Sequence, residues 1–301
     1  MNTKAWALVW TLAAWCAGAE GVLDTVKREE PSLAKKTVPI TVAGCRSSRY
    51  GIRPFPTDAE WISYAEKIKG LFPGNAPAFM WIVGCIGNNG HCYLNFPLGE
   101  PMEKASGSPV DRNESFLTLC DEKGCQVWLQ VEPGDADIVT LASRTLTRYS
   151  HHPSVRGFGV DVEWYKCANT KGYGTPLTDD VAEALDQAAK KVDRRFTCFV
   201  KHWDKKWLPK TYRSDMIFVN DSQGHSSLAS MRNEFKRWAD YFAPNTVIYQ
   251  IGYKADAKIW EPLEQPVKAL GDLFATGVQT NQTCGIIWVD FTLRRVMEKV
   301  K

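Results

Sequence analysis

Residues 156–165 read RGFGVDVEWY, a segment that combines the apolar pattern of a buried strand with two carboxylates. Because side chains two positions apart on a strand point to the same side, Asp161 and Glu163 share one face, while Val160 and Val162 share the other. In a parallel barrel the reacting groups lie at the C-terminal ends of the strands. The segment therefore predicts a strand whose two acids project into the mouth of a barrel.

Seven further segments are short and nearly continuously apolar, as expected for parallel strands that are covered on both faces. Together the expected strands are 37–44, 78–84, 126–131, 155–163, 196–203, 215–220, 246–251 and 284–290. Helices are expected at 57–70, 136–149, 178–192, 228–242, 266–275 and 292–301, with a weak candidate at 205–213 and a long irregular connection at 85–112. This alternation predicts a single-domain α/β protein, a (β/α)8 TIM barrel. An open doubly wound sheet is the alternative, but no G-x-G-x-x-G motif follows the first strand.

The N-terminus predicts export. Residues 1–19 contain one lysine, an apolar run and the small residues Ala17-Gly18-Ala19, which is typical of a signal peptide cleaved after Ala19. The apolar run is too short for a permanent membrane span. We therefore expect a signal peptide at 1–19, a polar leader at 20–36, a barrel domain at 37–301, a secreted protein and no membrane association after cleavage.

Nine cysteines minus Cys16 of the signal peptide leave eight. An even number in a secreted chain predicts disulfides, with Cys85–Cys92 and Cys120–Cys125 spaced for small loops, although the pairing stays open. A zinc site built on cysteines is disfavoured because no C-x-x-C pair is present. Glycosylation sequons occur at Asn113, Asn220 and Asn281.

The charge balance is nearly neutral, with 37 Lys and Arg against 34 Asp and Glu. A net charge of +3 offers no strongly basic field for nucleic acid, so nucleic-acid binding is excluded as a function class. Neither a G-x-S-x-G nucleophile motif nor an H-E-x-x-H helix is present. We expect a monomer that needs no cofactor and no metal.

The segment RGFGVDVE at 156–163 resembles the fourth-strand signature D-G-x-D-x-D-x-E of glycoside hydrolase family 18, which contains chitinases and endo-β-N-acetylglucosaminidases. Asp161 and Glu163 fall in register, whereas Arg156 and Gly159 replace the first two aspartates. The segments at 126–134, 215–221 and 284–290 resemble the third, sixth and last strands of that family.

This resemblance implies a role for four residues. Glu163 would be the general acid that protonates the glycosidic oxygen, and Asp161 would orient a 2-acetamido group that attacks the anomeric carbon. Trp288 would stack under the sugar, and Asp221 would help to position it. Asn220 stands where the family has a tyrosine that binds the acetamido oxygen, so acetamido-assisted chemistry is in question.

Other residues are candidates for the same cleft. Glu132, on one face with Gln130, is either a second carboxylate for an ordinary two-carboxylate mechanism or a partner in a salt bridge. His202, Asp290 and Tyr165 are candidates for lining the cleft, and each also fits an ordinary structural role.

The residues together predict a glycoside hydrolase acting on a polysaccharide or glycan, with N-acetylhexosamine as one expected component. The alternative is a carbohydrate-binding barrel without turnover. A structural Ca²⁺-binding protein is disfavoured, because the D-x-D-x-D-G pattern of calcium loops is missing. His151 and His152 precede the fourth strand and are expected at the opposite end from the mouth.

Overall fold

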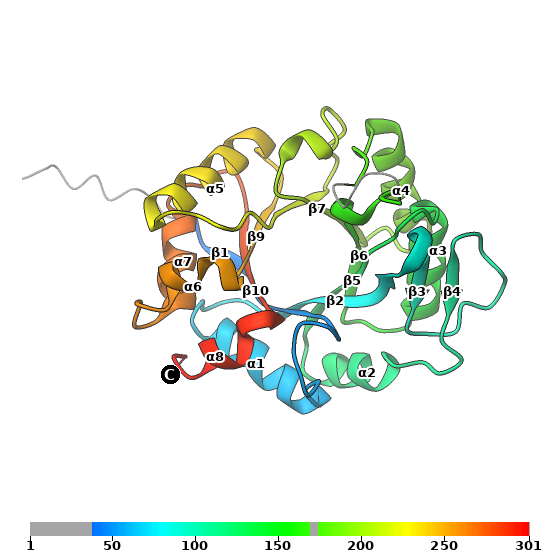
Figure 1. Ribbon diagram of the computed structural model, residues 1–301, viewed down its shortest axis with the longest axis horizontal. Helices are drawn as coiled ribbons and strands as arrows, with labels where there is room; N and C mark the ends of the chain where they lie inside the picture. Colours follow the sequence, from blue (N-terminus) through cyan, green and yellow to red (C-terminus); the bar gives the residue numbers. More distant parts are fainter. Residues whose placement is uncertain (1–37, 169–173, 301) are drawn as a thin grey trace, which may run out of the picture. The chain divides into compact units, whose positions relative to one another are not determined.

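The computed structural model describes residues 38–168 and 174–300, which belong to one compact unit. Eight parallel strands form a closed ring with the helices around it (Figure 1). The ring closes because β1 (Ile40–Ser47) pairs with both β10 (Cys284–Val289) and β2 (Pro77–Ile86). The prediction of a TIM barrel is confirmed, and the open doubly wound alternative is excluded. The predicted signal peptide and leader lie outside the described residues.

The remaining elements follow the ring in chain order. The other ring strands are β5 (Gln126–Val131), β6 (Val155–Asp161), β7 (Thr197–Lys201), β8 (Ile217–Asn220) and β9 (Val247–Ile251). The helices are α1 (Asp58–Gly70), α2 (Glu114–Glu122), α3 (Ile138–Tyr149), α4 (Asp179–Val192), α5 (Leu228–Phe242), α6 (Ala257–Trp260), α7 (Pro266–Ala275) and α8 (Leu293–Met297). Two short strands, β3 (Cys92–Leu94) and β4 (Ala105–Gly107), extend the sheet from β2 outside the ring.

Helix starts follow local side-chain chemistry. Thr57 caps α1 in a reciprocal arrangement, because its hydroxyl accepts from the backbone N–H of Glu60 at 3.3 Å while the Glu60 carboxylate accepts from the backbone N–H of Thr57 at 2.7 Å. Thr178 caps α4 by accepting from the backbone N–H of Val181 at 3.4 Å. These two predicted helix starts are confirmed.

Two regions differ from the sequence prediction. The connection expected to be irregular at 85–112 contains β3 and β4, and it is followed by α2, which was not predicted although Phe116, Leu117 and Cys120 bury one side of it. The weak helix candidate at 205–213 is wrong: only the 3₁₀ turn η3 (Lys205–Trp207) forms there. Pro209 explains this, since proline lacks the backbone N–H that a continuing helix requires.

The inner face of the ring is filled by side chains. Phe199, Val219 and Ile287 belong to the apolar cluster inside the barrel, whereas Trp288 belongs to the cluster between the strands and helices. The ring of Phe199 also explains Gly159, because a Cβ at position 159 would lie 2.0 Å from it. This alternation fixes which residue at the end of each strand faces the mouth.

The cysteines correct the expectation of a disulfide-containing fold, because no disulfide joins any of the eight cysteines in the described residues. Cys85 lies opposite Tyr93 in the β2–β3 pair and Cys92 lies opposite Ile86, so the one-residue offset turns the two thiols to opposite faces. Cys120 and Cys125 are hydrogen-bonded thiols, not a disulfide.

The distance between strand positions prevents another pairing. Cys284 lies opposite Ile40 and Cys45 lies opposite Trp288, four positions further along β10. At about 3.3 Å per residue, this offset is about 13 Å, more than a disulfide can span.

Two of the three sequons are inaccessible in the folded protein. Asn113 and Asn220 are fully buried, whereas Asn281 is exposed. Among the described residues, none of the helices combines the length and apolar character that crossing a bilayer requires.

Candidate active site

Lys201, the last residue of β7, places its ammonium group among three carboxylates. Its Nζ lies 3.0 Å from Asp161 Oδ2 and 4.0 Å from Glu163 Oε2, and it donates a hydrogen bond to Asp221 Oδ2. Only 2% of the Lys201 side chain is exposed. We call these four residues the Lys201 cluster, in which one buried cation couples an acid of β6, an acid of the turn after β6 and an acid that follows β8.

The alternation of β7 explains why Lys201 faces inward. Phe199 belongs to the cluster inside the barrel and Cys198 and Val200 to the outer cluster, so Lys201 shares the inner face with Phe199. The sequence analysis missed Lys201, although the same period of two was visible in the sequence and could have found it.

The neighbouring residue His202, which was predicted to line the cleft, is buried in aromatic packing instead. Its ring stacks on Trp203 at 4.1 Å and on Trp207 at 5.1 Å between centroids. Its Nδ1 accepts a hydrogen bond from the backbone N–H of Asp204 at 2.8 Å. The structure therefore gives His202 a packing role beside the site.

The two acids of the fourth ring strand converge as predicted, but from different elements. Asp161 ends β6, is buried, and lies 3.4 Å from the amide Nε2 of Gln130. Glu163 lies in the 3₁₀ turn η2 (Val162–Trp164) and not on the strand, which was predicted to run to 163. Because 24% of the Glu163 side chain is exposed, it is the more accessible of the two acids.

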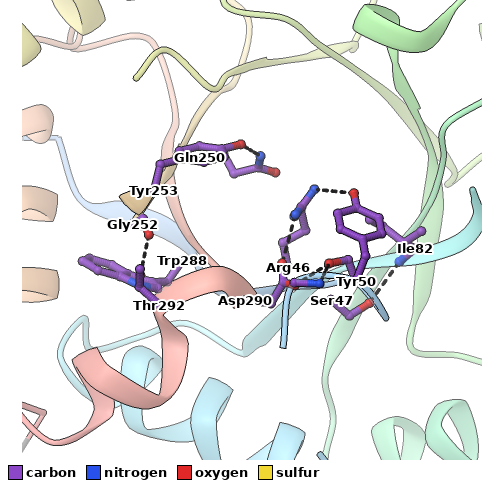
Figure 2. A network of polar contacts seen from close by, with 12 residues as sticks. Arg46, Ser47, Tyr50, Ile82, Gln250, Gly252, Tyr253, Trp288, Asp290 and Thr292 are labelled. Atoms are coloured by element: carbon purple, nitrogen blue, oxygen red, sulfur yellow. Dashed lines mark hydrogen bonds and ion pairs between the residues drawn. The ribbon is translucent and has the colours of Figure 1, made fainter. Parts of the chain in front are cut away.

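A second group of polar residues, the Arg46 cluster, consists of Arg46, Tyr50, Glu132 and Asp290 (Figure 2 shows three of them). Arg46 pairs with Asp290 at 3.0 Å and donates to the Tyr50 hydroxyl at 3.4 Å. Tyr50 in turn donates a hydrogen bond to Glu132, whose other oxygen accepts from the backbone N–H of Ile86 at 3.4 Å. Glu132 is therefore held by hydrogen bonds next to a buried guanidinium group.

Tyr253, which the sequence analysis did not identify, connects the Lys201 cluster to β9. Its hydroxyl lies 3.4 Å from Asp221 Oδ2 and accepts a hydrogen bond from the Gln250 side-chain amide. In Figure 2, Gln250 lies above and to the left of Arg46 and Tyr50, and only β10 separates its strand β9 from β1. Polar side chains thus reach the barrel mouth from several strands.

The two clusters contain five carboxylates and two cationic side chains, and burial shifts the pKa of three of the acids. Burial raises the pKa of Asp161 well above its usual value, against the opposing effect of Lys201. Burial also raises the pKa of Glu163; Lys201 opposes this shift and the charges of Asp221 and Glu132 add to it. The site therefore keeps Glu163 protonated to higher pH than an ordinary glutamate.

Glu132 and Lys201 show the two opposite effects of burial. Burial raises the pKa of Glu132, against the hydrogen bond from Tyr50 and the charge of Arg46. For Lys201 burial alone would lower the pKa, but the charges of Asp161 and Asp221 outweigh it and the pKa is raised. Lys201 is therefore a cation, not a neutral amine.

A cavity of about 760 Å³ opens next to the Lys201 cluster. Glu163, Asp221 and Trp203 line it, together with residues of the loop after β8 and of α5. The cavity is large enough for sugar units; Glu163 and Trp203 present an acid and an aromatic face to it, and the almost fully buried Asp221 borders it.

The other predicted residues lie elsewhere. Trp288 is fully buried on the outer side of β10, where its Nε1 donates to Thr292 Oγ1 at 2.9 Å; Figure 2 shows it beside Gly252, away from Arg46. Gly252 has a φ of +94°, and a Cβ there would lie 2.4 Å from the Trp288 ring. The expected sugar-stacking role of Trp288 is therefore incompatible with this packing.

Two further predicted residues also lie outside the cavity. Asn220 is buried, and its Oδ1 accepts from the backbone N–H of Ser222 at 2.7 Å. Because Val219 faces the inside of the barrel, Asn220 faces the helices. Tyr165 lines a separate cavity beside α3 and α4.

No family model matches the chain, and no curated protein matches it. The resemblance to glycoside hydrolase family 18 is therefore not established as membership. Among solved structures, the chain is similar to a beta-glucuronidase of an uncultured Clostridium species, with 12% identity, a TM-score of 0.46, and 84% of this chain and 43% of that chain covered. The chain thus spans less than half the length of that protein.

Two other solved structures show a similar degree of likeness. A candidate alpha-L-fucosidase from Bacteroides thetaiotaomicron has 10% identity and a TM-score of 0.42, with 96% of this chain and 98% of that chain covered. Yersinia pestis DHPS, solved with a pterine–sulfa conjugate, has 11% identity and a TM-score of 0.40, with 87% and 91% covered. These distant likenesses concern the barrel fold alone.

Proposed function

We propose that the protein is a glycoside hydrolase in which Glu163 is the general acid. The observation that supports this most strongly is that a carboxyl group with a raised pKa opens into the same cavity as a second carboxylate, Asp221. Glycoside hydrolysis uses a pair of carboxyl groups, one that donates a proton and one that acts as base or nucleophile.

In the proposed reaction, Glu163 donates its proton to the glycosidic oxygen as the bond between that oxygen and the anomeric carbon breaks. Asp221 stabilises the positive charge that develops at the anomeric carbon and accepts the proton of the water that attacks it. Lys201 and Asp161 act as positioning residues, because the ammonium group holds both Asp161 and Asp221. Acetamido assistance is not part of this proposal, because Asn220 faces the helices.

The proposed substrate is a polysaccharide or glycan. Trp203 lines the cavity and is only half-buried, so its ring offers an apolar face on which a sugar can stack. An N-acetylhexosamine unit in the substrate is proposed from the fourth-strand resemblance alone.

The test compares wild type with Glu163→Gln on a panel of neutral and amino-sugar polymers, with release of reducing ends as the measurement. General acid catalysis contributes about 10²–10⁴-fold, so Glu163→Gln should lose activity by that factor. Glu234→Gln is the matched control, because Glu234 lines the same cavity but pairs with Arg237 and not with Lys201. Equal release by wild type and Glu163→Gln would remove Glu163 from the mechanism.

The second candidate function is carbohydrate binding without turnover. The observation that favours it is that Lys201 pairs with two of the acids and that Tyr50 holds Glu132. This function predicts that wild type binds a glycan and that Trp203→Ala does not, while neither protein releases reducing ends. Turnover by wild type would exclude it.

Secretion and a monomeric state are proposed from the sequence. Expression in a secretory host should give a mature protein that begins at Glu20, as determined by N-terminal mass spectrometry. Recovery of the full-length chain inside the cell would contradict the signal-peptide interpretation. Size-exclusion chromatography with light scattering should give the mass of one chain, and a dimer mass would contradict the monomer proposal.

A further inference from the structure

A cluster of nitrogen and oxygen ligands lies away from the barrel mouth, between α2 and the turn that joins α3 to β6. Glu114 is the first residue of α2, and His151 and His152 follow α3. The Oε1 atom of Glu114 lies 2.9 Å from His151 Nε2 and 3.2 Å from His152 Nε2. One atom from each of the three side chains falls within 4.8 Å of the other two.

These separations are close to those of a metal site. Zinc bonds to histidine nitrogen and carboxylate oxygen are about 2.0–2.2 Å, so two ligands of a tetrahedral ion lie about 3.3–3.5 Å apart. The two separations between Glu114 Oε1 and the histidine nitrogens, 2.9 and 3.2 Å, lie within about 0.6 Å of that value. The side chains of Glu114 and His151 are 49% and 57% exposed, which leaves a path from solvent.

The hydrogen bond on the other side of His152 supplies a second observation. Its Nδ1 lies 2.7 Å from Asp121 Oδ2, and Asp121 Oδ1 accepts from the backbone N–H of Ser154 at 2.8 Å. The Asp121 carboxylate is thus fixed by the backbone of Ser154 on one side, and it contacts the His152 ring at Nδ1 on the other.

The contact of Nδ1 with Asp121 leaves Nε2 as the ring atom of His152 that lies beside the Glu114 carboxylate, at 3.2 Å. A carboxylate that holds one ring nitrogen while the other points to the ligand group is the arrangement that orients histidine ligands in metal sites.

We propose that Glu114, His151 and His152 bind a divalent transition metal of the Zn²⁺ class, with water as the fourth ligand and Asp121 orienting His152. Two imidazoles and one carboxylate suit zinc, whereas Ca²⁺ and Mg²⁺ prefer oxygen ligands. The ion would fasten α2 to the α3–β6 turn, so the site is structural and independent of the proposed hydrolysis. It revises the expectation that the protein has no metal site.

The experiment titrates the metal-free Cys85→Ser protein with Zn²⁺ in a calorimeter and follows the melting temperature of the same samples. Cys85 is replaced because it is a partly exposed thiol that would bind zinc independently of the three-residue cluster. The Cys85→Ser protein should bind one equivalent and melt at a higher temperature with Zn²⁺ than with Ca²⁺ or Mg²⁺. Co²⁺ should give the visible absorption of a tetrahedral site.

Variants separate a metal site from an ordinary cluster of ion pairs. His151→Ala and Glu114→Gln change exposed side chains, and each should weaken Zn²⁺ binding by at least about tenfold without loss of folding. Asp121→Asn removes the carboxylate that orients His152 and should weaken Zn²⁺ binding by about 10–100-fold. The control is His91→Ala, because His91 lies outside the cluster and is hydrogen-bonded to Ser106. This variant should leave Zn²⁺ binding unchanged. Binding of less than one equivalent, or equal binding by wild type and His151→Ala, would overturn the proposal. So would an imidazolium signal of His152 by NMR at pH 7.5 in the presence of excess Zn²⁺.

Discussion

Replacement of Lys201 by methionine removes the charge at the centre of the Lys201 cluster and keeps most of the side-chain volume. The ammonium group lies 3.0 Å from Asp161 and is almost completely buried. At an effective dielectric constant near 20, that single attraction is about 5–6 kcal/mol before the cost of desolvation is subtracted. Removal of one partner from a buried ion pair costs about 3–5 kcal/mol, because the other charge is left uncompensated. We expect Lys201→Met to lose about that much free energy of unfolding at pH 8.

The loss should depend on pH in a defined direction. Burial raises the pKa of Asp161 in the folded protein above its unfolded value, so its favourable contribution is present below the unfolded pKa and is lost as the pH rises through the folded pKa. Without Lys201 this pKa rises further, and the penalty for ionising Asp161 grows. The difference between wild type and variant should therefore be largest at pH 8 and should shrink towards pH 4.

Urea unfolding at pH 4, 6 and 8 measures this difference by linear extrapolation. Lys236→Met is the control, because Lys236 forms an exposed pair with Asp240 at 2.6 Å and should change the free energy of unfolding by less than about 1 kcal/mol. A Lys201→Met protein that matches the control at pH 8, or whose loss does not vary with pH, would refute the idea of a buried cation shared by the acids.

Three further outcomes follow from the same structure. Hydrolysis should fall as the pH rises through the raised pKa of Glu163, and Lys201→Met should move this limb of the pH–rate profile to higher pH because the charge of Lys201 lowers that pKa; an unmoved limb would assign it to another group. Trp203→Ala should raise KM for a polymer about 5–30-fold through loss of an aromatic stacking face, and an unchanged KM would place the sugar elsewhere. In a glycosylating host, Asn281→Gln should remove any glycan mass, while Asn113→Gln should leave it unchanged; loss of mass in the second variant would contradict the burial of Asn113.

The fold could be predicted because the strands are apolar on both faces. A segment such as 126–131 has few other ways to bury so many apolar side chains, and β5 spans the same residues. The helix candidate at 205–213 was wrong, since Pro209 lacks the backbone N–H that a continuing helix requires.

The side of a strand that faces the barrel was harder to predict at the site. The period of two placed Asp161 on the inner side, whereas Glu163 reaches the Lys201 cluster from the 3₁₀ turn η2 and not from the strand that was predicted to contain it. In the last strand Ile287 and Trp288 are both apolar, so the sequence did not indicate which one faces inward. The contact between Arg46 and Asp290 joins residues 244 positions apart, and no local pattern contains that information.

The disulfide prediction was wrong for a related reason. An even number of cysteines indicates that pairs are possible, but pairing depends on distances and directions that the fold alone sets. The one-residue offset between Cys85 and Cys92 across β2 and β3 is an example.

The proton donated by Glu163 can be tested with leaving groups that differ in their need for it. Dinitrophenol departs without protonation, whereas the hydroxyl of a sugar does not. With the sugar that wild type releases from its polymer, Glu163→Gln should hydrolyse the dinitrophenyl glycoside at a rate close to wild type, yet lose about 10²–10⁴-fold on the polymer. An equal loss on both substrates would contradict the assignment of Glu163 as the general acid.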